Sequence, residues 1–188
     1  EAAVSSRDER LEHFPSLGVA TSHMCRDPLL AYGAKGFADH QKGISSYEVE
    51  QIILAIIVTT GVASIFLTKD FTPDYNSGLA HAIFYALTSY PIIEEKHLHG
   101  EVVGFGILLA LLVDGQDEEF EKIYQLNKAV KLPVSLEEIE ISEQQWEEST
   151  NRIPHMSDVA HYPYAVTKQM LAEAMRKLKE RAGRENHE

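Results

Sequence analysis

The chain has 188 residues, 44% of them hydrophobic and 24% charged, which are the proportions of an ordinary globular protein rather than of a disordered or fibrous one. A chain of this length removes roughly 70% of its unfolded surface from water, so we expect one domain with a packed core over residues 1–188. The formal net charge of −12 repels phosphate groups, which argues against nucleic acid and anionic membranes as partners.

The cysteine content and the apolar runs indicate a compartment. The single cysteine, Cys25, can form no internal disulfide, so we expect a buried thiol in a reducing compartment. The longest apolar runs, 52–67 and 102–113, are shorter than the roughly 20 residues that cross a bilayer. We therefore predict a cytoplasmic protein without a membrane span, in which these runs are buried helices. Because residues 1–14 look like the continuation of a helix, we also expect a fragment of a longer chain.

The spacing of apolar residues predicts a series of helices, over 17–39, 46–67, 77–89, 97–114, 117–130, 142–150 and 164–182. Pro28 is a possible kink in the first of these, and Ser45 or Ser46 can cap the second. The second helix is apolar nearly all round past Ile52, so we expect it in the middle of the domain. Alternating runs that would form strands are nearly absent. The fold class predicted from the sequence is therefore all-α, a multi-helix bundle.

Two histidines stand at the starts of neighbouring apolar helices, His81 in the segment 77–89 and His99 in the segment 97–114. Their imidazoles meet if the two helix starts approach each other, which the spacing alone does not decide. A histidine at a helix start more often bonds to the backbone than to a metal. At this point the pair is either two core histidines or two halves of one metal site.

Three motifs follow one another around these histidines: Ala80-His81-Ala82, His99-Gly100-Glu101 and Lys131-Leu132-Pro133. In order and spacing they resemble the C-terminal half of the iron-containing alcohol dehydrogenase superfamily, most closely its glycerol dehydrogenase-like branch. That branch has an Ala-His-Ala helix start, a His-Gly-Glu tripeptide and a Gly-Leu-Pro turn. The specific motifs lie within residues 77–135, and a fainter likeness extends over most of the chain.

The resemblance implies a helical metal- and substrate-binding C-terminal domain of dehydroquinate synthase-like fold, part of an NAD(P)-dependent alcohol or polyol dehydrogenase. Carried onto matching positions, His81 and His99 are ligands of a divalent metal, zinc or iron, which polarises the substrate hydroxyl for hydride transfer. The implied partners are a small alcohol, an N-terminal nucleotide-binding domain that this chain lacks, and further copies of the same subunit.

Parts of that machinery are missing from the sequence. The family's aspartate ligand lies in a Gly-Asp motif, but the chain has no Gly-Asp pair, and Asp8 stands in a polar run. The Gly-rich turn that holds a cofactor pyrophosphate is absent as well. We therefore expect the chain to begin just after that aspartate, to bind metal weakly and not to transfer hydride alone.

The identity of the substrate stays open. Many glycerol dehydrogenases carry another histidine three residues after the position of His81, where this chain has Phe84, so the pocket is more apolar. A dehydrogenase of 2-hydroxy or 2-oxo acids from the same superfamily is one alternative. A non-catalytic helical interaction module is another, and a hydrolase ranks last.

The other candidate residues are assigned smaller roles. Alternate residues of a helix face apart, so His97 is expected at the surface and not beside His99. Glu101 is expected to act on the helix dipole or to support the site. His155 and His161 lie in an irregular loop and are candidates for lining the pocket.

Overall fold

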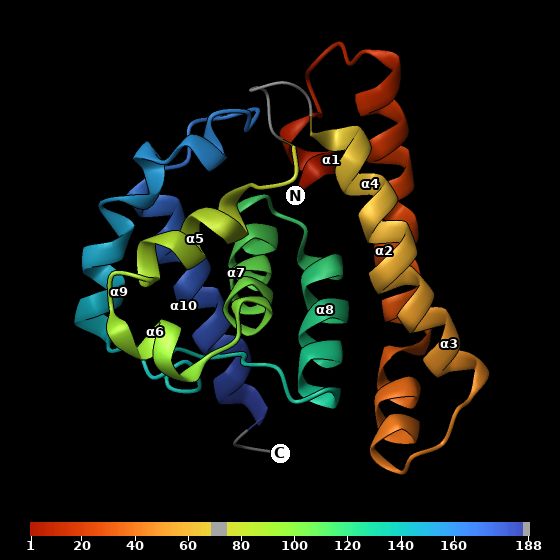
Figure 1. Cartoon of the computed structure of the whole chain (residues 1–188). Helices are drawn as coiled ribbons and strands as arrows, with labels where there is room; N and C mark the ends of the chain where they lie inside the picture. The colour runs from red at the N-terminus through yellow and green to blue at the C-terminus, as the bar shows by residue number, and fades with distance from the viewer. Residues whose placement is uncertain (69–74, 186–188) are drawn as a thin grey trace. The chain divides into compact units, whose positions relative to one another are not determined.

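The computed structural model describes residues 1–68 and 75–185, and these contain helices and no strand, so the predicted all-α class is confirmed (Figure 1). In chain order the elements are α1 (Ala2–Ser5), α2 (His13–Gln41), α3 (Tyr47–Leu54), the π-helical turn η1 (Ala55–Thr59), α4 (Thr60–Leu67), α5 (Leu79–Leu87), α6 (Pro91–Lys96), α7 (His99–Val113), α8 (Asp117–Ala129), α9 (Glu143–Thr150), the short 3₁₀ turns η2 (Ile153–His155) and η3 (Ser157–Val159), and α10 (Lys168–Glu185). They form two compact units, an N-terminal unit of Ala2–Asn76 and a C-terminal unit that consists of Glu1 and Ser77–Glu188.

The predicted helices are present, with ends that differ from the predictions by a few residues. Helix α6 was not predicted, because its six residues are too few to show a periodic pattern. Pro91 is its first residue, a position where the missing N–H of proline costs nothing. Helix α2 continues through Pro28 without interruption. Cys25, expected to be buried, is half-buried, and its thiol contacts the Thr21 carbonyl.

In the N-terminal unit, α3, η1 and α4 form one continuous helix that follows α2 (Figure 1). Ser46 caps this helix, as predicted, by accepting a hydrogen bond from the Val49 N–H at 3.4 Å. Two glycines of α2 permit the close packing, since a Cβ on Gly36 would collide with the Ile52 side chain and a Cβ on Gly18 would lie 2.8 Å from Leu67. The contact therefore runs along one side of each helix.

The prediction that this apolar helix lies in the middle of the domain is wrong. Only 11% of its most apolar stretch is buried, and Ile57 and Ile65 are 69% and 73% exposed. The length argument from the sequence is also wrong here, because Tyr47–Leu67, at 21 residues, is long and apolar enough to cross a membrane by length and composition. Hydrophobicity identifies a helix that needs to be covered, but it does not say which surface covers it.

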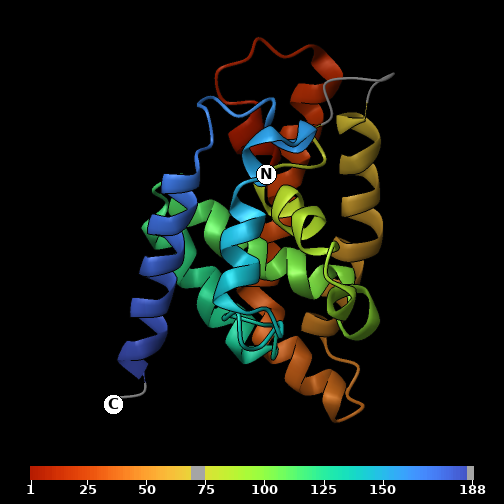
Figure 2. The same cartoon turned by 90° about the vertical axis from the view of Figure 1, so that its left-hand side faces the viewer.

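In the C-terminal unit, α7 is the central helix and contacts α5, α8 and α10 (Figure 1). It has almost no polar face, and its side chains fill the core, as predicted: Val102, Val103, Phe105, Leu108, Leu109 and Leu112 are buried. Helix α10 crosses α7, packs against it and also touches α9 (Figures 1 and 2). The helix that carries His99 is thus held on several sides, and this rigid support fixes where its first turn lies.

Candidate metal centre

The starts of α5 and α7 meet because α7 has a glycine where α5 crosses it. A Cβ on Gly106 would lie only 2.7 Å from the Ala80 carbonyl oxygen and 3.0 Å from the Ala80 Cα. His81 follows Ala80 directly, and His99 lies two turns before Gly106 on the same helix. The centroids of the two imidazole rings are 5.4 Å apart, with the ring planes at 44°. The structure therefore brings together the two histidines that the sequence singled out.

Glu1 binds His81 at two points. One carboxylate oxygen accepts a hydrogen bond from the His81 backbone N–H at 3.1 Å, and the other lies 2.6 Å from the ring Nδ1. The Glu1 and His81 side chains are only 13% and 21% exposed, so little water competes for this contact. The neighbouring Gly78 leaves room for it, since a Cβ there would lie 3.2 Å from the Glu1 Cβ.

The same contact shifts both ionisations. The hydrogen bond to Glu1 raises the pKa of the His81 imidazole above its ordinary value, against an opposing effect of burial, and the charge of Asp158 adds to the rise. Burial by itself would raise the pKa of the Glu1 carboxyl, but the hydrogen bonds from His81 and the charge of its imidazole lower it. Glu1 is thus held as a carboxylate, which only accepts hydrogen bonds.

The His99 imidazole has different surroundings. It is exposed, and it packs edge-on against the Phe84 ring with the centroids 4.4 Å apart. It makes no hydrogen bond to any other residue in the part of the chain that the structure describes. Its ring nitrogens are accordingly accessible to a ligand from solvent.

The pair fits half of a zinc or iron site. Two imidazoles that share one tetrahedral ion at a Zn–N distance of about 2.0–2.1 Å have ring centroids about 5 Å apart, close to the 5.4 Å found for His81 and His99. Within residues 1–68 and 75–185, however, no group of three or more His, Cys, Asp and Glu side chains is arranged to hold a metal ion. Two nitrogen donors are present, and metal binding stays a prediction.

Several known proteins are similar to this chain in sequence, although no family model matches it. The chain is 30% identical over 129 residues to glycerol dehydrogenase of Escherichia coli O6:H1 (strain CFT073), a match that covers 66% of this chain and 32% of that protein. It is 28% identical over 166 residues to hydroxycarboxylate dehydrogenase A of Escherichia coli K12, which covers 86% of this chain and 44% of that protein. The resemblance to the glycerol dehydrogenase branch is confirmed.

Solved structures agree in fold. Glycerol dehydrogenase of Schizosaccharomyces pombe superposes with a TM-score of 0.75 over 97% of this chain and 48% of that protein, at 18% identity. A probable glycerol dehydrogenase of Sinorhizobium meliloti 1021 gives a TM-score of 0.71 over 88% of this chain and 45% of that protein, at 23% identity. This chain therefore spans less than half the length of these glycerol dehydrogenases and of hydroxycarboxylate dehydrogenase A.

Aromatic side chains border the histidine pair on the α5 side. Phe84, which stands where many glycerol dehydrogenases carry a histidine, is half-buried against His99. Tyr85 is 47% exposed, with its ring centroid 6.3 Å from that of His81. The site therefore has an apolar wall beside its two nitrogen donors.

The loop after α9 contributes a residue that the sequence analysis missed. Its 3₁₀ turn η3 packs on α5, and Asp158 in this turn lies near enough to His81 for its charge to raise the pKa of the imidazole. His155 and His161 were the candidates from this loop; His155 is exposed, and His161 is half-buried. Their role as pocket residues stays a prediction. No sequence signal marks Asp158, because only the packing of η3 on α5 places it there.

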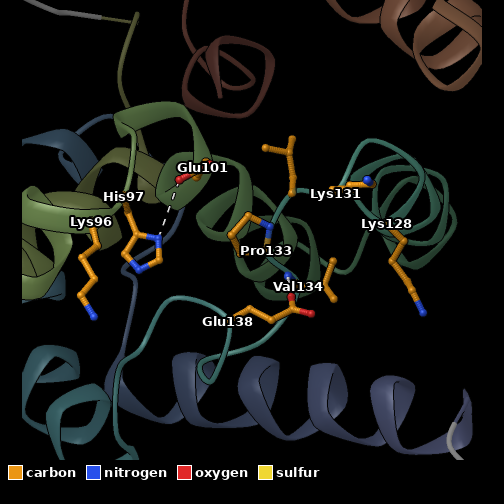
Figure 3. A pocket seen from close by; sticks show the side chains of 9 residues that line it. Lys96, His97, Glu101, Lys128, Lys131, Pro133, Val134 and Glu138 are labelled. Carbon is orange, nitrogen blue, oxygen red and sulfur yellow. Dashed lines mark hydrogen bonds and ion pairs between the residues drawn. The ribbon is translucent and has the colours of Figure 1, made fainter. Parts of the chain in front are cut away.

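His97 was expected at the surface, and this is wrong: its side chain is only 10% exposed. It borders a separate cavity of about 540 Å³ that also contacts the loop after α8 (Figure 3). The His97 Nδ1 lies 3.7 Å from Glu101, whose carboxylate accepts the Leu98 N–H at 2.9 Å and so caps α7. Glu138, on another wall of the cavity, accepts the Val134 N–H at 2.6 Å. Both carboxylates therefore support the backbone, and the role of Glu101 at the helix start agrees with the sequence analysis.

Proposed function

We propose that this chain is the helical metal- and substrate-binding part of a metal-dependent NAD(P) alcohol dehydrogenase similar to glycerol dehydrogenase. The observation that carries the proposal is the approach of the His81 and His99 imidazoles to 5.4 Å at the starts of two helices. A helical interaction module has no need of two imidazoles that meet at one accessible point. The family resemblance gives this pair a chemical role.

In this role His81 and His99 hold a divalent ion, zinc or iron, through their neutral ring nitrogens. When bound, such an ion supplies Lewis-acid chemistry that lowers the pKa of an alcohol hydroxyl. Phe84 packs edge-on against the exposed His99 ring and forms an apolar wall on one side of the site. Glu1 and the core around α7 keep the two rings in place before substrate arrives.

The other parts of the enzyme are assigned to sequence outside this chain. The aspartate ligand and the NAD(P)-binding domain belong to the remaining length, since the chain spans under half of its relatives. The whole enzyme is proposed to be a cytoplasmic homo-oligomer that acts on a small alcohol or polyol. With two donors and no cofactor domain, the chain by itself binds metal weakly and is inactive.

A 2-hydroxy acid is the second candidate substrate. The match to hydroxycarboxylate dehydrogenase A covers 86% of this chain, against 66% for the glycerol dehydrogenase of Escherichia coli O6:H1. Phe84 also removes a polar side chain from the place where a polyol would bind. Measuring kcat/KM of the full-length enzyme for glycerol and for a series of 2-hydroxy acids separates the two candidates.

The test of the proposal is alanine substitution of each histidine in the full-length enzyme. His81→Ala and His99→Ala are expected to abolish turnover and bound metal while the circular dichroism spectrum stays unchanged. His23→Ala, an exposed position on α2, is the matched control and should keep both activity and metal. Turnover and metal content that survive His99→Ala, with effects only on stability or partner binding, would favour the interaction module.

A further inference from the structure

We propose that Glu1 is a positioning residue, which fixes the tautomer of His81 so that Nδ1 carries the proton and Nε2 is the metal-binding nitrogen. This inference rests on the function proposed above and adds to it the residue that prepares the ligand. It is drawn from the two-point contact of Glu1 with His81 and from the position of that contact at the start of α5.

The first point of contact holds the carboxylate in place. The first N–H groups of a helix have no partner within the helix, and a side chain of the N-cap residue commonly accepts one of them. The N-cap of α5 is Gly78, which has no side chain. Glu1 accepts the N–H of His81, the third residue of the helix, in its place. The Leu79 N–H donates to the Tyr162 hydroxyl at 3.2 Å, so this helix start is capped by residues far away in the sequence.

The second point of contact sets the chemistry of the ring. A neutral imidazole has one N–H donor and one nitrogen with a free lone pair, and the partner of one nitrogen decides the state of the other. The Glu1 carboxylate only accepts, and its oxygen lies 2.6 Å from Nδ1, so Nδ1 must be the donor. The lone pair then lies on Nε2. A carboxylate behind a metal-binding histidine is a recurrent arrangement, and it also makes the ring nitrogen more basic.

Glu1 could instead be a metal ligand itself, but its geometry opposes that role. Each of its oxygens already accepts one hydrogen bond from His81. Coordination through the oxygen near Nδ1 would break the bond that orders the ring. The positioning role uses both contacts as they stand, and the two roles differ in how far the loss of Glu1 lowers the zinc affinity.

The substitution Glu1→Gln makes the sharpest test, because an amide has one acceptor and one donor end. If the amide oxygen keeps the bond to the His81 N–H, the amide NH₂ faces Nδ1 and donates to it. The ring then carries its proton on Nε2, and the nitrogen needed for the metal is blocked. Glu1→Ala removes both contacts and leaves a mixture of tautomers. Glu137→Gln, at an exposed site in the same unit, is the matched control.

The tautomers are read in the ¹⁵N-labelled, metal-free chain from long-range ¹H–¹⁵N correlation spectra. Because Glu1 raises the pKa of His81, the pH is increased from about two units above the ordinary imidazole pKa of about 6.5 until the His81 signals no longer shift and the ring is neutral. We expect His81 to carry its proton on Nδ1 in the wild-type and Glu137→Gln chains and on Nε2 in Glu1→Gln, with His99 unchanged throughout. Zinc titration of the same samples should show affinity lower by roughly 10–100-fold for both Glu1 variants.

The outcomes separate this inference from the proposed function. An His81 tautomer that is the same in the wild type, Glu1→Gln and Glu1→Ala would overturn the inference. The inference would also be overturned if the tautomers changed as expected but the zinc affinity stayed the same. A complete loss of zinc binding in Glu1→Ala would overturn it as well, because Glu1 would then be a metal ligand. Tautomers as expected without zinc binding even in the wild type would contradict the weak metal binding proposed for this chain, and would leave Glu1 as the residue that sets the His81 ring.

Discussion

The crossing of α5 and α7 can be tested by adding a single methyl group to α7. Gly106→Ala places a Cβ 2.7 Å from the Ala80 carbonyl oxygen and 3.0 Å from the Ala80 Cα, and backbone atoms cannot turn aside as a side chain does. Gly104→Ala is the control in the same helix: its Cβ would meet Leu132 and Asn127 at 3.7 and 3.9 Å, which is ordinary contact. We expect Gly106→Ala to be the less stable of the two variants.

The expected size of the effect comes from comparing the free energies of unfolding of the two variants, because the gain in helix propensity is the same in both and cancels. Each substitution removes a glycine from the interior of α7, which stabilises a helix by about 1 kcal/mol. Only Gly106→Ala must also move the start of α5, and overpacking of this kind costs about 1–3 kcal/mol. Gly106→Ala should therefore have a free energy of unfolding about 1–3 kcal/mol below that of Gly104→Ala. Because His81 is adjacent to Ala80, the same shift should weaken metal binding.

Urea denaturation followed by tryptophan fluorescence measures this difference. Trp146 is the only tryptophan of the chain, it is 4% exposed, and it lies in α9 of the C-terminal unit, so its signal reports on the unit that contains the crossing. For slopes of roughly 2 kcal/mol per molar urea, the midpoints of the two variants should differ by about 1 M. A Gly106→Ala protein as stable as Gly104→Ala would show that the crossing is not tight, and the explanation of how His81 meets His99 would fail.

Three further substitutions test the C-terminal unit. The hydrogen bonds from Arg181 lower the pKa of Glu121 to about 2 from 4.5, so the stability from this pair is complete above pH 4.5 and is lost as the pH falls towards 2. Acid unfolding curves should therefore show that Glu121→Gln loses less stability than the wild type over that range. The difference should be under about 1 kcal/mol, because Glu121 is half-exposed. Ser142→Ala removes the helix cap that accepts the Gln145 N–H at 3.3 Å, and urea unfolding followed by fluorescence should show a free energy of unfolding lower by about 1 kcal/mol. An unchanged midpoint would rule out this cap as a stabilising contact. Lys131 has a left-handed backbone with φ of 62°, so thermal unfolding of Lys131→Gly should show a stabilisation of up to about 1 kcal/mol, and a destabilised variant would contradict the assigned conformation.

The candidate site could be predicted in part. His81 and His99 were found from motifs, because residue type and spacing survive in a sequence without any knowledge of packing. Their separation of 5.4 Å was not predictable, since it depends on how α5 crosses α7 at Gly106. Glu1 was missed because it lies 80 residues from His81, and no local pattern connects them.

The sequence by itself determined the helices and the family. Helical periodicity, caps such as Ser46 and turn residues act within a few positions of the chain, so they can be read without a fold. Only the tertiary structure decided which of the apolar helices is covered: α7 is buried by α5, α8 and α10, whereas Tyr47–Leu67 packs along α2 and keeps most of its apolar surface exposed. The physical reason is that hydrophobic burial has no direction. A sequence records how apolar a helix is, and the surfaces available to cover it come from distant parts of the chain.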